Sequence, residues 1–273
     1  MKIKDLIFQI KNKRSFLCIG LDTDINRIPK FILNKEDPIF FFNKSIIDKT
    51  HKYCVAYKLN TAFYESLGTL GWVSMKKTID YINKNFPEIF TIADAKRGDI
   101  GNTSMMYAKA FFENMNFDSI TVNPYMGSDC VKPFLEFKDK ISILLGLTSN
   151  PGASDIQLKK TNNDYIFTEM IKSSVSWGNN ENMMYVVGAT KPQFIEKIRK
   201  IIPHHFLLIP GVGAQGGDLN KICKYAVNDN IGLIINSSRS IIYSSNNEDF
   251  ADAAAKISES LQKQMKVIIS AKK

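Results

Sequence analysis

The sequence predicts an α/β protein, a (β/α)8 TIM barrel built as a single domain over residues 1–273. Eight short apolar runs recur along the chain, segments with helical spacing separate them, and eight such units in about 250 residues is the usual size of this fold. A doubly wound open sheet is the alternative. Against it, no GxGxxG motif follows the first apolar run, and no Pro/Gly/Ser-rich linker divides the chain.

The apolar runs are continuous rather than alternating, which is typical of parallel strands buried on both faces. We expect strands at 16–22, 54–59, 90–95, 119–123, 141–148, 184–189, 206–212 and 232–236. Helical spacing relates Tyr107, Phe111 and Met115, then Ile195, Ile198 and Ile202, and finally Phe250, Ala254, Ile257, Leu261 and Met265. The polar stretch 149–164 is long for a connection and is a candidate lid.

Composition excludes several classes of protein. The formal net charge is +9, but the lysines and arginines are scattered, which favours a solvated surface over a nucleic-acid stripe. The four cysteines form no CxxC pair, and Cys18 and Cys54 lie in apolar runs, so we expect reduced core residues. Three histidines leave little material for a zinc site or a serine triad. No apolar run is long enough for a membrane helix, and we expect a cytoplasmic protein.

Active sites in this fold lie where strands end and the following loops begin. The seventh expected strand ends in a glycine-rich turn, 210–217, and the eighth ends in 236–239 with Arg239. A glycine-rich turn exposes N–H groups to an anion, and a guanidinium matches two phosphate oxygens. Two such loops on adjacent strands predict a phosphate site. The alternative is a simple tight turn with Arg239 paired to a surface carboxylate.

The third expected strand carries the sharper signal. Asp94 and Lys96 are two residues apart, so both side chains point into a barrel, and Asp99 follows closely. Lys58, at the end of the neighbouring strand, can join them. Two ammonium groups and two carboxylates in one pocket shift each other's pKa values, which is typical of a catalytic site. A structural ion-pair network at the barrel rim is the alternative, because buried charges must be paired in any case.

The run from Asp94 to Thr103 resembles the D-x-K-x-x-D-I signature of the orotidine 5′-phosphate decarboxylase family. The resemblance extends over nearly the whole chain. It includes 18–22, Lys58 with 62–65, the base-binding loop 148–152, and the phosphate loops 210–218 and 236–239. Thr23 and Leu59 depart from the family pattern, which often has prolines there.

The resemblance implies that orotidine 5′-monophosphate is converted to uridine 5′-monophosphate (UMP) and CO2, the last step of de novo pyrimidine nucleotide synthesis. The family uses no metal or other cofactor. The implied catalytic residues are Lys96 as proton donor to C6, Asp94 beside the substrate carboxylate, Lys58 as its holder, and Asp99. In the family this last aspartate and the threonine matching Thr103 come from the partner subunit, which implies a homodimer with shared sites.

The resemblance also implies how the rest of the substrate is held. Asp22 would bind the ribose, Thr148 and Ser149 the pyrimidine, Gln215 both base and phosphate, and Arg239 the phosphate. The full set of implied substrate-binding residues is Asp22, Thr103, Asn123, Thr148, Ser149, Pro210, Gln215, Gly216, Ser238 and Arg239. The sequence leaves open whether orotate phosphoribosyltransferase, the preceding enzyme, associates with the chain.

Two other functions compete. Related barrels that act on sugar phosphates share the D-x-K-x-x-D run but use magnesium, which would need further carboxylates, and Glu65 is the only spare acid. They also lack the loop 148–152. A non-catalytic nucleotide or nucleic-acid binder would fit the positive charge, but it has no use for the four charged residues. We expect neither a nucleic-acid nor a membrane partner.

Overall fold

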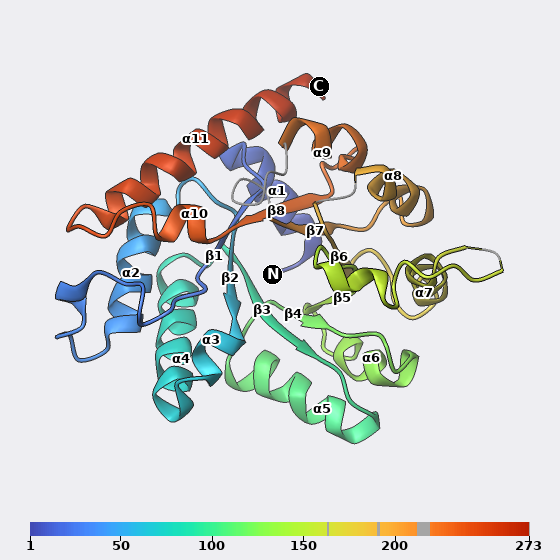
Figure 1. Ribbon diagram of the computed structural model, residues 1–273, viewed down its shortest axis with the longest axis horizontal. Helices are drawn as coiled ribbons and strands as arrows, with labels where there is room; N and C mark the ends of the chain where they lie inside the picture. The colour runs from blue at the N-terminus through green and yellow to red at the C-terminus, as the bar shows by residue number, and fades with distance from the viewer. Residues whose placement is uncertain (163, 190–191, 212–218, 273) are drawn as a thin grey trace.

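The computed structural model describes residues 1–162, 164–189, 192–211 and 219–272. Eight parallel strands close into a barrel in chain order, with helices around it (Figure 1). The predicted (β/α)8 barrel is therefore confirmed, and the open sheet is excluded. The strands are β1 (Leu17–Gly20), β2 (Ala56–Asn60), β3 (Phe90–Arg97), β4 (Ser119–Val122), β5 (Ile141–Leu147), β6 (Met183–Val187), β7 (Leu207–Pro210) and β8 (Leu233–Ser237).

The helices cover the outside of the barrel, and α1 closes its amino-terminal end. Lys13, at the end of α1, donates to the carbonyls of His51 and Cys54 just before β2. The helices are α1 (Ile3–Lys13), α2 (Pro38–Thr50), α3 (Thr61–Glu65), α4 (Gly68–Asn85), α5 (Gly101–Lys109), α6 (Ser128–Leu135), α7 (Ile166–Ser174), α8 (Pro192–Ile201), α9 (Leu219–Ala226), α10 (Arg239–Ile242) and α11 (Phe250–Ala271). No helix in these described ranges is both long and apolar enough to span a membrane.

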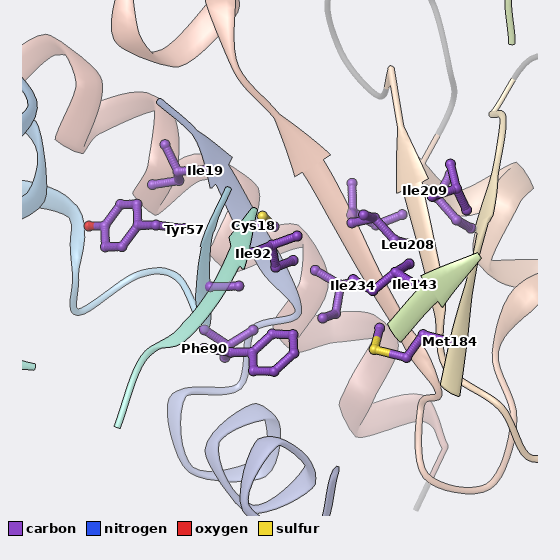
Figure 2. Packing of buried hydrophobic residues seen from close by; sticks show 14 of the residues in the cluster. Cys18, Ile19, Tyr57, Phe90, Ile92, Ile143, Met184, Leu208, Ile209 and Ile234 are labelled. Carbon is purple, nitrogen blue, oxygen red and sulfur yellow. The ribbon is translucent and has the colours of Figure 1, made fainter. Parts of the chain in front are cut away.

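The barrel interior is filled by apolar side chains up to the level of the charged residues. Figure 2 shows the side chains of Phe90 and Ile92 of β3 on the same side of their strand, while Tyr57 of β2 points away from them. The Tyr57 hydroxyl is hydrogen-bonded to Thr50 of α2, outside the barrel. Side chains alternate along a strand, so the next residue of β2, Lys58, points inward. The apolar core therefore forms the floor beneath the charged groups.

Two details differ from the sequence predictions. The expected apolar face of the last helix includes Ile257, but this side chain is 39% exposed. The helix expected through Met115 ends its α-helical part at Lys109 and continues as a π-helical turn, in which Met115 N–H donates to the Ala110 carbonyl. Cys18 and Cys54 are buried and form no disulfide, as predicted, and Cys130 and Cys223 are buried as well.

A buried histidine stands at the amino-terminal end of β7. His205 is 8% exposed, its ring packs edge-on against Tyr185, and neither ring nitrogen has a hydrogen-bond partner among the described residues. Burial, together with the nearby Arg199 and His204, lowers the pKa of His205 to about 4. Arg199 is held there by carbonyl oxygens, including that of His205 at 2.6 Å. The protein therefore folds with this imidazole neutral.

Replacing His205 with phenylalanine should remove an acid-dependent loss of stability. A histidine with a lowered folded pKa takes up its proton more readily when unfolded, so its stabilising effect is lost as pH falls from about 6.5 to 4. The loss amounts to roughly 3 kcal/mol in the free energy of unfolding. Urea unfolding between pH 4 and 7 should show a shallower pH dependence for His205→Phe than for wild type. The exposed neighbour offers the control, His204→Phe, and equal pH dependence in all three proteins would refute the prediction.

Candidate active site

Two lysines and two aspartates meet inside the barrel mouth at the ends of β1, β2 and β3. Lys58 Nζ lies 2.9 Å from Asp94 Oδ2 and 3.4 Å from Asp22 Oδ1, and Lys96 Nζ lies 2.6 Å from Asp94 Oδ1. Strand register brings them together, because Gly20 pairs with Lys58 in the sheet. We call Asp22, Lys58, Asp94 and Lys96 the charge array. Its signs alternate, so every neighbouring pair attracts.

A local irregularity of β3 brings Lys96 into the array. Between Ala93 and Arg97 the register against β4 shifts, so that β3 bulges at this point. Lys96 has a φ of +48°, a left-handed conformation that is unusual for a residue with a side chain. Its N–H donates to the Thr121 hydroxyl, which lies 3.1 Å from Asp94 Oδ1. Strain of this kind clusters at functional sites, where the surrounding structure holds it in place.

The array fixes the ionisation of its two central members. Burial alone would raise the pKa of the Asp94 carboxyl, but Lys58 and Lys96 outweigh it and hold that pKa well below its usual range. Burial alone would lower the pKa of the Lys58 ammonium, but Asp22 and Asp94 raise it above its ordinary value. Both groups are charged throughout the neutral range. The Lys96 side chain is half exposed and faces the open mouth.

Asp22 joins the first and last strands of the barrel. Its Oδ2 lies 2.8 Å from the Ser238 hydroxyl, which also lies 3.1 Å from the Gly20 carbonyl. This approach requires a glycine, since a Cβ at position 20 would come within 2.7 Å of the Ser238 Cβ. Asp22 and Ser238, which are 216 residues apart in sequence, therefore share one polar contact at the mouth.

Neither Asp99 nor Thr103 makes a hydrogen bond or ion pair with the charge array of its own chain, as far as the described residues show. The Asp99 carboxylate accepts a hydrogen bond from the N–H of Ile100 and has no ion pair within the described part of the chain. Thr103 is exposed on α5. Within one chain, the second carboxylate beside Lys58 is that of Asp22. Exposed apolar side chains surround this region, namely Ile100, Met106, Tyr125 and Met126.

The loop after β5 holds the predicted base-binding residues. Gln157 binds Thr148 twice, accepting from its N–H at 2.9 Å and donating to its hydroxyl at 2.8 Å. Ser149 lies against Gly188, where a Cβ would come within 2.9 Å of it. The expected lid, 149–164, begins with a 3-10 turn over Pro151–Ser154 and ends at Asp164, which pairs with Lys172 and Lys197. Residue 163 lies outside the described residues.

The structure describes only part of the expected phosphate site, because residues 212–218 lie outside the described ranges. Pro210 ends β7 and pairs with Asn236 of β8, and Arg239 begins α10 with an exposed side chain. Arg239 has no ion pair within the described part of the chain. Gln215 and Gly216 lie in 212–218, outside the described residues. Asn123 follows β4, and its N–H donates to the Arg97 carbonyl next to the bulge.

Three residues of the site were missed from the sequence. Thr121 binds Asp94, Gln157 orients Thr148, and Tyr243 contacts the backbone of Asp22. Thr121 could have been found, because it stands two residues before Asn123 and faces the same side of the strand. Gln157 and Tyr243 carry no such signal, since their contacts depend on how loops fold back.

Glu65, the spare acid of the magnesium alternative, is already paired. It contacts the Arg97 guanidinium, which also packs over the rings of Tyr107 and Phe111 at 5.4 and 5.6 Å. Within the described ranges, no cluster of three or more His, Cys, Asp or Glu side chains is arranged to hold a metal ion.

These features define a (β/α)8-barrel enzyme with alternating charges at its strand ends. The model of the orotidine 5′-phosphate decarboxylase / HUMPS family matches residues 15–254, and the chain belongs to this family. It is 58% identical over 265 residues to a protein of Christiangramia forsetii, with 97% of each chain covered. It is 57% identical over 272 residues to one of Flavobacterium johnsoniae, with 100% of each covered. Both are named orotidine 5′-phosphate decarboxylase.

Solved structures agree with this assignment. The putative orotidine-monophosphate-decarboxylase of Toxoplasma gondii superposes with a TM-score of 0.86 at 29% identity, covering 98% of both chains. UMP synthase of Leishmania donovani gives a TM-score of 0.83 at 33% identity, covering 96% of this chain and 57% of that one. The resemblance inferred from the sequence is thus confirmed. That one domain takes up all of 1–273 stays a prediction.

Proposed function

We propose that this chain decarboxylates orotidine 5′-monophosphate without a cofactor, with Lys96 as the proton donor to C6. The observation that carries the proposal is the Asp94 carboxylate, held between Lys58 at 2.9 Å and Lys96 at 2.6 Å at the barrel mouth. Family membership and the relatives above make the chain an orotidine 5′-phosphate decarboxylase, a carboxy-lyase of the last step of pyrimidine biosynthesis.

In this mechanism the bond between C6 and the carboxylate breaks, and its electron pair stays on C6 while CO2 leaves. Lys96 stabilises the developing negative charge and transfers a proton from Nζ to C6; solvent then reprotonates the amine. The ionised Asp94 sits beside the substrate carboxylate, and their repulsion ends when CO2 departs. Lys58 keeps Asp94 in position. A preorganised array does this at no reorganisation cost during the reaction.

The remaining residues bind the parts of the substrate that do not react. Asp22 and Lys58 would hold the ribose, Thr148 and Ser149 the base, and Arg239 the phosphate. Asn123, Pro210, Gln215, Gly216 and Ser238 complete the proposed binding set. Two features support it: Arg239 is exposed, and Gln157 holds Thr148 in one orientation. Binding energy from the remote phosphate can then lower the activation free energy of the reaction at C6.

We further propose a homodimer in which Asp99 and Thr103 enter the partner's site. Asp99 is unpaired within the described part of its own chain, and Ile100, next to it, is 64% exposed. The apolar side chains of Met106, Tyr125 and Met126 would be covered by the same interface. Association with orotate phosphoribosyltransferase and location in the cytoplasm stay predictions.

Mixing two inactive variants tests the mechanism and the shared site together. Lys96→Ala and Asp99→Ala proteins should each be inactive, but a mixed dimer contains one site with both residues. Random exchange makes half of all dimers mixed, so activity should recover to about one quarter of wild type. The assay follows the loss of substrate ultraviolet absorbance, with EDTA present throughout.

The matched control mixes Lys96→Ala with Asp94→Asn. These two residues contact each other within one chain, so every site in the mixed dimer stays defective and no activity should return. Absence of recovery in the first mixture, despite subunit exchange verified by native mass spectrometry, would refute the shared site. Recovery in both mixtures would refute the assignment of the array to a single chain.

A further inference from the structure

The segment that carries Asp22 is held at its backbone by two tyrosine hydroxyls. Tyr243, which follows α10, accepts from the Asp24 N–H at 2.7 Å and donates to the Asp22 carbonyl at 3.1 Å. Tyr64 of α3 donates to the Leu21 carbonyl at 2.8 Å. The backbone around Asp22 is therefore held by two elements that are far apart in sequence. Tyr64 holds the Leu21 carbonyl, and Tyr243 holds the Asp22 carbonyl and the Asp24 N–H.

Tyr243 is built to serve as both donor and acceptor. Its ring packs against Phe42, with ring centroids 6.0 Å apart, and the Arg27 guanidinium lies 4.1 Å above its centroid. Burial raises the pKa of Tyr243, so the side chain stays a phenol at neutral pH. A phenolate could not donate to the Asp22 carbonyl, whereas the phenol can hold both backbone groups at once.

On the other side, a buried polar network supports the same segment. Asn43 of α2 accepts from the Thr23 hydroxyl at 2.6 Å and donates to Tyr64 Oη at 3.0 Å and to Thr78 at 3.1 Å. All four side chains are almost completely buried. With this side already rigid, the Tyr243 hydroxyl supplies the contact next to Asp22 that the network does not make.

A small movement of the Asp22 side chain would break its contacts with Lys58 and Ser238. Its distance to Lys58 Nζ is 3.4 Å, longer than the 2.9 Å between Lys58 and Asp94. A further shift of about half an ångström would end that hydrogen bond. The Ser238 contact at 2.8 Å depends on the same placement. Asp22 is therefore the member of the charge array most sensitive to its backbone.

We propose that Tyr243 is a positioning residue for the decarboxylation. Its hydroxyl acts through the backbone of 22–24 to hold the Asp22 carboxylate on Lys58 and Ser238. Tyr243 contacts the charge array only at the backbone carbonyl of Asp22, and within the described residues it makes no hydrogen bond to the side chain of any array member. The proposal rests on the proposed role of Asp22 in the reaction. It means that Tyr243, which directly follows α10, fixes the backbone that follows β1.

Tyr243→Phe tests this proposal, because it removes one oxygen and keeps the ring against Arg27 and Phe42. We expect a folded protein whose kcat/KM for orotidine 5′-monophosphate falls about tenfold, as a displaced binding group would cause. Tyr185→Phe is the matched control. Its buried hydroxyl bonds to Ser174 at 2.8 Å on the outside of β6, so its loss should lower the melting temperature and leave kcat and KM unchanged.

A double variant shows whether Tyr243 acts through Asp22. In an Asp22→Asn background, Tyr243→Phe should change kcat/KM less than twofold, because the group it positions is already lost. An undiminished tenfold effect there, or a Tyr243→Phe protein that does not fold, would overturn the positioning role. If Asp22→Asn alone keeps wild-type kinetics, the failure lies instead in the proposed function, which assigns Asp22 to the substrate.

Discussion

Lys96→Ala is expected to abolish turnover and leave the fold intact. The Lys96 side chain is 50% exposed, so its ion pair contributes little to stability, at most about 1 kcal/mol. Asp94 keeps Lys58 and Thr121 as partners after the change. Catalysis, in contrast, loses both its proton donor and the cation that faces the developing charge. Together these effects should lower kcat at least 10³-fold, by order of magnitude.

Lys77→Ala is the matched control for this variant. Lys77 is 44% exposed and pairs at 3.2 Å with Asp37, which is 12% exposed, on the outside of the barrel between α4 and α2. The environment thus matches that of Lys96 and Asp94 in exposure and charge, but it lies away from the strand ends. Both variants should lose a similar, small amount of thermal stability, and only Lys96→Ala should lose activity. Substantial turnover by Lys96→Ala would remove it from the mechanism.

Lys58→Met should destabilise the folded protein strongly. The lysine is 5% exposed and neutralises two carboxylates, Asp22 and Asp94, which are 16% and 13% exposed. Removing one partner of a buried pair leaves an uncompensated charge, which costs roughly 3 kcal/mol or more in the free energy of unfolding. In a chain of this size the melting temperature should fall by about 6–12 °C. Chemical and thermal unfolding at pH 7 measure the loss.

The pH dependence of this loss has a definite sign. Asp94 has a lowered pKa, so its pairing stabilises the fold above the unfolded value of about 4 and fades as pH falls below it. Lys58 has a raised pKa, so its contribution is complete below about 10 and is lost at higher pH. The difference between wild type and Lys58→Met should therefore be largest between about pH 5 and 9 and shrink in acid.

Adding Asp94→Asn to Lys58→Met separates pairing from packing. If the destabilisation comes from an unpaired carboxylate, the double variant should lose less free energy of unfolding than the two single variants lose together. The reason is that the charge that lacks a partner has been removed. Strict additivity of the two losses would show that Lys58 stabilises the protein by packing alone.

The sequence by itself determined the parallel α/β pattern and most of the candidate site positions, and it favoured a barrel over an open sheet. Continuous apolar runs at eight places are typical of parallel strands that are buried on both faces and covered by helices. Once these strands close in chain order, every strand end lies at one mouth, so the ends of β2 and β3 that carry Lys58 and Asp94 meet there. Alternation along β3 put Phe90, Ile92 and Asp94 on one face, and the family signature in the same strand pointed to the chemistry.

Only the tertiary structure decided which groups complete the array. The Asp22 contact with Ser238 joins residues from the first and last strands, and no local pattern in either segment contains the other. The bulge that gives Lys96 its left-handed conformation depends on the register against β4. Tyr243 finds the Asp22 backbone through the fold of a short helix. Local patterns set which face a residue occupies, whereas contacts between loops depend on how all eight strands close.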